Sequence, residues 1–111
     1  IVYATLVYNN DTKYFKVYVK NVGLEPIYNI GKFDVYLGTV GSAKLYMYNP
    51  ANTTAEGWDY VEKGTSNNIF DVGETLEISI FNQTTIQPPF YIKIVTPEGI
   101  SDTYVFNPPF S

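Results

Sequence analysis

The chain has 111 residues, of which 45% are hydrophobic and 17% aromatic, and its formal net charge is −4. This length suits one domain with one core and is too short for two, and the apolar content excludes an intrinsically disordered chain. The seven basic residues are lysines spread from Lys13 to Lys93, so they do not form the dense cationic face that binding to nucleic acid or to an anionic membrane surface requires.

Alternation of apolar and polar residues dominates the chain from end to end. In the segment 15–20, for example, every second residue is apolar, which is typical of a strand with one buried face. No window shows the 3.6-residue period of a helix. The strands that we expect, about eight in number, are 2–8, 15–20, 32–37, 43–48, 58–61, 75–80, 91–94 and 101–106.

The shared parity of these strands predicts an all-β domain, residues 1–111, whose core joins the inner faces of two antiparallel sheets. The glycines and prolines fall between the apolar runs, where turns need them. The longest irregular stretch, 49–66, is expected to be an insertion or a loop around the Trp58 strand. The residues that we expect to be buried together are Phe15, Val17, Val19, Val35, Leu37, Leu76, Ile78, Ile80, Ile92 and Ile94.

Catalytic chemistry has few candidate residues in this chain. Cysteine and histidine are both absent, which removes the thiol nucleophile, thiolate metal sites and the commonest general base. Glu56, Asp59 and Glu62 offer the paired carboxylates of a glycoside hydrolase, but their polar loop favours solvated side chains. We therefore expect no enzyme activity and assign no catalytic residues.

A hard-cation site is the other chemistry that oxygen ligands allow. Asp71, Glu74 and the pair Asn67-Asn68 supply such ligands, but the alternating acidic loop of a calcium site is absent. The segment 71–74 is better interpreted as a turn in which Asp71 accepts backbone hydrogen bonds. We expect neither a metal nor a cofactor.

Tyrosine is unusually frequent, with 11 residues in the chain. Several tyrosines lie opposite an aliphatic face and are expected on an outer sheet surface, where they suit protein contacts or stacking on sugar rings; cross-strand packing explains them equally well. With few charges to blunt its strand edges, the domain is expected to associate through an aromatic face or an edge strand. The candidate contact residues are Tyr18, Tyr36, Tyr46, Tyr48 and Phe81.

Sequons for N-glycosylation occur at Asn10, Asn52 and Asn82, each in an expected turn or loop. Glycans at these asparagines, together with the absence of cysteine, fit an archaeal cell exterior.

Three segments carry a resemblance to a known family. The first is 18–23 with its Asn-Val-Gly turn, followed after a mixed segment by the strand 33–38. The second is Trp58 followed by 70–78, with Asp-Val-Gly-Glu before an alternating strand, and the third is 92–99 with a closing strand and turn. In order, and over about residues 14–106, they resemble the exterior domain of the FlaG/FlaF family of archaellum accessory proteins, with FlaG slightly favoured, and the related domain of archaellin.

This resemblance implies an immunoglobulin-like β-sandwich that has a structural, non-enzymatic role in archaeal motility. It implies a stator that anchors the archaellum motor, associating with itself or a companion accessory protein and with the surface layer. It also implies a location between membrane and surface layer, with an N-terminal membrane helix that precedes residue 1. The alternative hypothesis is a carbohydrate-binding or adhesion module that uses Trp58, Tyr46, Tyr48 and Tyr60 as a stacking platform; a glycosidase is a third.

Overall fold

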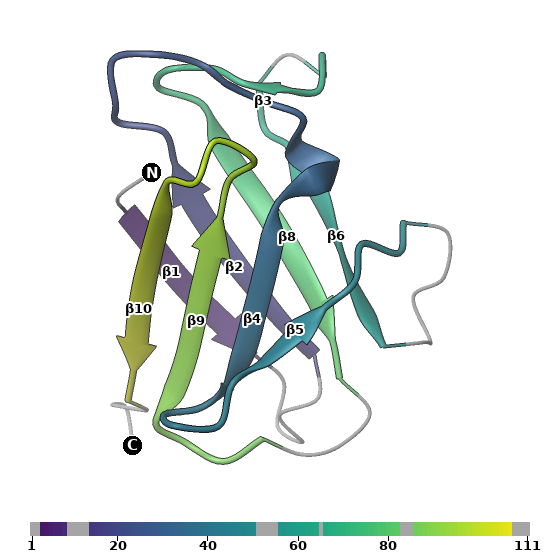
Figure 1. Ribbon diagram of the computed structural model, residues 1–111, viewed down its shortest axis with the longest axis vertical. Helices are drawn as coiled ribbons and strands as arrows, with labels where there is room; N and C mark the ends of the chain where they lie inside the picture. Colours follow the sequence, from purple (N-terminus) through teal and green to yellow (C-terminus); the bar gives the residue numbers. More distant parts are fainter. Residues whose placement is uncertain (1–2, 9–13, 51–55, 65, 83–85, 108–111) are drawn as a thin grey trace.

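The computed structural model describes residues 3–8 by their backbone, and residues 14–50, 56–64, 66–82 and 86–107 with their side chains. These described residues form ten strands and one short 3-10 turn, most of which are labelled in Figure 1. They are β1 (Tyr3–Tyr8), β2 (Tyr14–Lys20), β3 (Ile27–Tyr28), η1 (Ile30–Lys32), β4 (Asp34–Thr39), β5 (Lys44–Tyr46), β6 (Gly57–Glu62), β7 (Ile69–Phe70), β8 (Thr75–Phe81), β9 (Phe90–Val95) and β10 (Ser101–Phe106).

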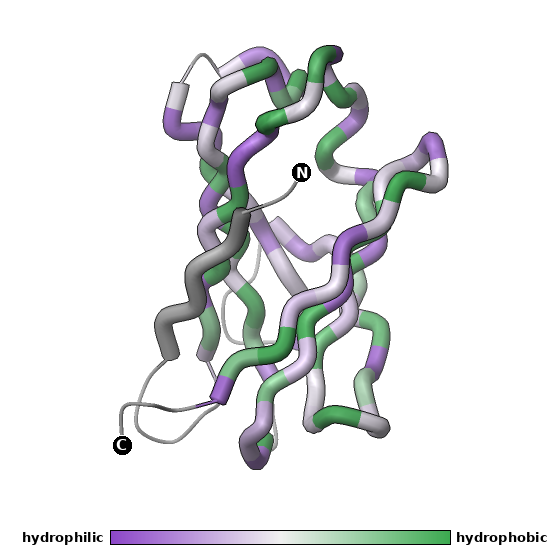
Figure 2. The backbone as a smooth tube through the Cα atoms, turned by 90° about the vertical axis from the view of Figure 1, so that its left-hand side faces the viewer, coloured by the Kyte–Doolittle hydropathy of each residue, from purple (hydrophilic) through white to green (hydrophobic). Residues whose placement is uncertain are grey.

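The strands form an antiparallel β-sandwich of two four-stranded sheets. One sheet has the order β1-β2-β8-β6 and the other the order β10-β9-β4-β5, while β3 and β7 form a small separate ribbon. Figure 1 shows one sheet in front of the other, and Figure 2 shows the two layers from the side, with hydrophobic and hydrophilic residues alternating along the strands. The all-β sandwich expected from the alternation is confirmed, and within the described residues no helix has the length and hydrophobicity to cross a membrane.

The core lies between the two sheets and contains every residue that parity predicted for it. All ten of those side chains are 0% exposed. The register explains why, since Val17 pairs with Ile78 across one sheet and Leu37 pairs with Ile92 across the other. Each such side chain contributes about 1.5–3 kcal/mol by leaving water.

Aromatic residues join the two layers. Phe15 of one sheet and Phe90 of the other pack with ring centroids 5.2 Å apart and ring planes at 72°, which is the favoured edge-to-face arrangement. Trp58 and Phe70 are also buried completely or nearly so, at 1% and 0% exposed. The expected loop 49–66 thus contributes a core residue and the strand β6.

The two lateral sides of the sandwich differ. On one side the chain after β5 pairs with β6, because Trp58 N–H donates to the Met47 carbonyl at 3.0 Å and Asn49 N–H donates to the Trp58 carbonyl at 2.8 Å. On the opposite side β1 and β10 are the outermost strands of their sheets. Among the described strands, β1 and β10 each pair with one neighbour and offer an edge to another strand, whereas the edge of β6 is covered only where Trp58 pairs with the chain after β5.

Candidate functional site

Two of the sequence motifs meet at one end of the sandwich. Asn21 is 1% exposed, and its amide nitrogen donates to the carbonyls of Glu25 and Phe70 at 3.0 and 2.9 Å. Its backbone N–H donates to the Glu74 carbonyl, and Gly73 N–H donates to the Asn21 carbonyl at 2.7 Å. The Asn-Val-Gly and Asp-Val-Gly-Glu segments thus form one hydrogen-bonded junction, in which Asn21 satisfies buried backbone groups.

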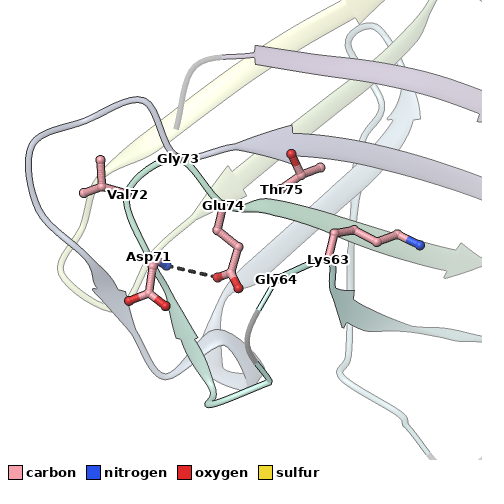
Figure 3. A pocket seen from close by; sticks show the side chains of 7 residues that line it. All are labelled: Lys63, Gly64, Asp71, Val72, Gly73, Glu74 and Thr75. Atoms are coloured by element: carbon pink, nitrogen blue, oxygen red, sulfur yellow. Dashed lines mark hydrogen bonds between the residues drawn. The ribbon is translucent and has the colours of Figure 1, made fainter.

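The pocket beside this junction has a volume of about 390 Å³, and its lining includes Asp71 and Glu74, two of the residues considered for a cation (Figure 3). Glu74 is 7% exposed and accepts the Asp71 N–H at 3.0 Å. Burial raises the pKa of Glu74, and the charges of Glu62 and Asp71 act in the same direction, against the Asp71 hydrogen bond. In Figure 3 the Asp71 carboxylate points away from Glu74. A turn is present at 71–74, with Gly73 at φ 85° and the Glu74 N–H donating to the Asp71 carbonyl at 3.0 Å. The expected role of Asp71 differs, because the carboxylate that accepts a backbone hydrogen bond in this turn is that of Glu74. The residues that the structure describes contain no group of three acidic side chains that could hold a metal.

The three carboxylates considered for glycoside hydrolysis have separate local partners. Glu56 forms an ion pair with Lys44, and Asp59 accepts the Tyr60 N–H at 2.7 Å. Glu62 accepts the backbone N–H groups of Asn67 and Asn68 at 3.3 and 3.0 Å. These contacts give each carboxylate a structural role in its own turn or strand.

The five candidate contact residues do not form one surface. Tyr18 and Phe81 lie on the outer face of the β1-β2-β8-β6 sheet, where Phe81 packs against Tyr14 with ring centroids 4.9 Å apart. Tyr36 lies on the outer face of the opposite sheet, and Tyr48 lies beside Trp58 at the closed lateral side. For Phe81 the geometry favours the cross-strand packing alternative.

The outward orientation expected for Tyr46 is wrong. Tyr46 pairs with Val35 in the β4–β5 register, so its side chain shares the inner face and is 3% exposed. Its hydroxyl donates to Asn82 Oδ1 at 2.7 Å, and burial, followed by the charge of Glu56, raises the pKa of Tyr46 to about 12. Tyr46 is a core residue.

The sequon at Asn82 is also placed differently from the expectation. Asn82 is 4% exposed and its amide oxygen accepts the Tyr46 hydroxyl, so in the folded domain a glycosyl group would have to displace this contact. The expected exposure of Asn82 is therefore wrong. Asn10 and Asn52 lie outside the described residues.

The two outer sheet faces differ in charge. On the β1-β2-β8-β6 sheet, Glu77 is bridged by Lys63 at 3.2 Å and Lys16 at 3.8 Å. We call the opposite outer face the Tyr36 face; by the strand register its side chains come from Asp34, Tyr36, Leu45, Tyr91, Lys93, Val95, Ser101, Thr103 and Val105. It carries one cation, which lies 5.9 Å from the Tyr36 ring centroid, and one anion. The Tyr36 face ends at the β10 edge, where Val105 is 52% exposed.

A groove at the junction end was not anticipated from the sequence. It has a volume of about 750 Å³ and includes Leu24, which is 97% exposed, and Ile100, which is 51% exposed. The charged side chains that line it are all acidic: Glu25, Glu98 and Asp102. In the sequence, the feature that could have indicated this groove is Leu24, an apolar residue that lies between Gly23 and Pro26 and outside any strand pattern.

Three of the four residues of the alternative stacking platform do come together. Tyr48 lies with its ring centroid 4.8 Å from that of Trp58 and 5.8 Å from that of Tyr60, while Tyr46 is buried elsewhere in the core. Tyr48 is 38% exposed, whereas Trp58 is 1% exposed. Trp58 therefore supports the platform from inside and Tyr48 presents it to solvent.

The comparisons with known proteins show a similarity to archaellum stator proteins. No family model matches the chain, and no curated protein sequence matches it. Among solved structures, the archaellum periplasmic stator protein FlaG from Sulfolobus acidocaldarius is similar, with 27% identity and a TM-score of 0.74 over 96% of this chain and 95% of that one. The periplasmic stator protein complex of FlaF and FlaG from the same organism matches with the same identity and TM-score, over 96% of this chain and 85% of the matched chain.

Proposed function

We propose that this chain, which is similar over nearly its whole length to the archaellum stator protein FlaG, is a FlaG/FlaF-type, non-enzymatic structural subunit of the archaellum motility machinery. The observation that carries the proposal is the match to FlaG over nearly the full length of both chains. A small sandwich that lacks cysteine and histidine, and whose candidate carboxylates have structural partners, suits a mechanical role. The FlaG branch is favoured because the structure of FlaG alone matches over 95% of its length.

The proposed partners are a second copy of this chain, a companion accessory protein and the surface-layer protein. The solved stator complex of FlaF and FlaG supports a companion of the FlaF type. The corresponding location is the archaeal cell exterior, between membrane and surface layer, with the full-length protein anchored in the membrane. The relation to archaellin stays a prediction.

The Tyr36 face together with the β10 edge is the surface that we assign to association. Its exposed residues are mostly uncharged, with Val105 at 52% and Leu45 at 41% exposed, and interface cores are depleted in charge and enriched in tyrosine. The adjacent β10 edge offers unpaired backbone groups for strand addition. The opposite outer face, with its Lys16–Glu77–Lys63 bridges, lacks this character.

Two matched valines test the assignment. Val105 on the Tyr36 face and Val61 on the opposite outer face are 52% and 49% exposed, and both lie on edge strands. We expect Val105→Lys to weaken self-association or companion binding at least tenfold in sedimentation velocity, because an unpaired charge opposes burial in an interface. Val61→Lys should leave association unchanged.

A third variant tests whether association uses the Tyr36 face or the groove at the junction end. Leu24→Glu disrupts the groove at the junction end without touching either sheet face. If Leu24→Glu alone abolished association, the contact would belong to the groove and the assignment to the Tyr36 face would be wrong. If the unmodified domain stayed monomeric at high concentration and bound neither a companion accessory domain nor surface-layer protein, the stator proposal itself would fail.

A further inference from the structure

A second pocket lies at the closed lateral side of the sandwich, away from the Tyr36 face. It has a volume of about 360 Å³, within the range of small-molecule sites. Four segments far apart in the sequence converge on it: the η1 turn, the chain after β5, strand β6 and the loop before β7. Its lining residues are Asn29, Gly31, Lys32, Tyr48, Tyr60 and Asn68.

One wall of this pocket is a fixed aromatic surface. The Tyr48 and Tyr60 rings are stacked, with centroids 5.8 Å apart and planes at 28°, and Trp58 packs against both. A Cβ at position 31 would lie 3.1 Å from the Tyr48 ring, so Gly31 lets the η1 turn approach it closely. Tyr48 is thereby held in one orientation while 38% of its surface stays exposed. Such a preorganised ring costs little entropy when a ligand stacks on it.

The lining also contains two asparagines in an uncommon backbone conformation. Asn29 and Asn68 have φ values of 59° and 61°, in the left-handed region that asparagine tolerates better than most residues. Asn68 Oδ1 accepts the Tyr60 hydroxyl at 2.9 Å, which leaves the two Asn68 amide hydrogens for another acceptor. Asn29 makes no side-chain cap for η1. Within the described residues, neither the Asn29 amide nor the Lys32 ammonium has a side-chain partner.

The charges in and around the pocket favour a neutral ligand over a polyanion. Lys32 is the one charged residue in the lining. Burial raises the pKa of the Tyr60 hydroxyl to about 12, and the nearby charges of Glu62 and Asp59 act in the same direction. A polyanion would meet these carboxylates with only one cation to balance them. A neutral ligand with one flat apolar side and several hydroxyl groups fits the combination of ring and amides.

We propose that this pocket binds a saccharide, with one pyranose ring stacked on Tyr48 and its hydroxyl groups hydrogen-bonded by Asn29, Asn68 and Lys32. The proposal does not depend on the stator function, because it uses none of the residues of the Tyr36 face. A domain that associates through one face and binds a glycan at its lateral side would make two different contacts at once.

Trp58 provides a direct readout, because it is the only tryptophan of the chain and contacts Tyr48. The purified domain should be titrated with maltose, mannobiose and N,N′-diacetylchitobiose, and then screened on an array of neutral oligosaccharides. We expect a saturable change in Trp58 fluorescence with at least one of these sugars. In a ¹⁵N–¹H NMR titration, the backbone amides of Asn29 and Asn68 should shift with the same dissociation constant.

Glycine variants separate the amides from the fold. Asn29→Gly and Asn68→Gly keep the positive φ without strain and remove the side-chain amides, Asn68→Gly together with its bond to the Tyr60 hydroxyl. Tyr48→Leu removes the ring. Each should lower the affinity at least tenfold, while Tyr36→Leu on the outer Tyr36 face should leave it unchanged. Thermal melts check that each variant is folded. Absence of saturable binding to any sugar on the array, or binding that survives Tyr48→Leu and both glycine variants, would overturn the proposal.

Discussion

Tyr46 shows how one side chain links the two sheets. It belongs to β5, whereas Asn82 follows β8 in the opposite sheet, and the hydrogen bond between them is 2.7 Å long and buried. Lys44 covers the Tyr46 ring at 5.4 Å from its centroid. The bond therefore fixes the β5 side of the sandwich in addition to the apolar packing.

Removal of the Tyr46 hydroxyl should destabilise the fold. Tyr46→Phe should lower the free energy of unfolding by about 1–2 kcal/mol, since Asn82 Oδ1 loses a buried donor and the ring volume stays the same. Urea denaturation measures the difference. The matched substitution Tyr36→Phe, on the outer face, should change stability by less than about 0.5 kcal/mol; an equal loss at both positions would contradict the role given to the Tyr46–Asn82 bond.

Strands β2 and β8 are joined by charge on their outer face as well as by their backbone. Glu77 of β8 is 9% exposed and lies between Lys16 of β2 and Lys63. Burial acts to raise the pKa of Glu77, but hydrogen bonds from Lys63 and Tyr18 and the charges of both lysines outweigh it, so the pKa is lowered. The ionised carboxylate is thus better stabilised in the folded chain than in the unfolded one.

This lowered pKa predicts a defined pH dependence. Above the ordinary pKa of 4.5, Glu77 is charged in both states and its contacts stabilise the fold; as pH falls through the lower folded-state pKa, that contribution is lost. Glu77→Gln should therefore cost about 1 kcal/mol at pH 7 and progressively less below pH 4.5. Urea denaturation across this pH range checks it, with Glu98→Gln in the exposed β9–β10 turn as the control for net charge. A cost that stayed constant with pH would contradict the assignment.

At the scale of the whole molecule, the sandwich has one continuous core, so a single charge placed in it should unfold the entire domain. Val17 is 0% exposed in the centre of β2, and Val17→Asp places an unpaired carboxylate between the sheets. The expected cost is comparable to the total stability of a small domain, about 5–15 kcal/mol. Loss of the cooperative thermal transition and of NMR dispersion would show it.

The control for this substitution is Val105→Asp, on the edge strand β10, where the valine is 52% exposed. It should melt close to the unmodified protein. A folded Val17→Asp domain with a normal melting temperature would mean that the core tolerates a carboxylate.

The amino-acid sequence by itself determined the strands of the two sheets and the core, but not the two-residue strands β3 and β7. All eight expected strands are present, and all ten predicted core residues are fully buried, because a side chain in a strand alternates faces with a period of two and a slip of one residue would expose a whole apolar set. The resemblance to the FlaG/FlaF family, based on short turn and strand motifs, is likewise supported by the comparison with solved structures.

Only the tertiary structure decided which polar and aromatic residues meet. The inner position of Tyr46 depends on the pairing of a short edge strand with its partner, here Val35 of β4, and no local pattern encodes that pairing. The Asn21–Glu74 junction joins segments about fifty residues apart. The pocket at Tyr48 is lined by residues from four separate segments. Alternation encodes which face of a strand is buried, whereas contacts between separate segments depend on how the sheets and loops pack in three dimensions.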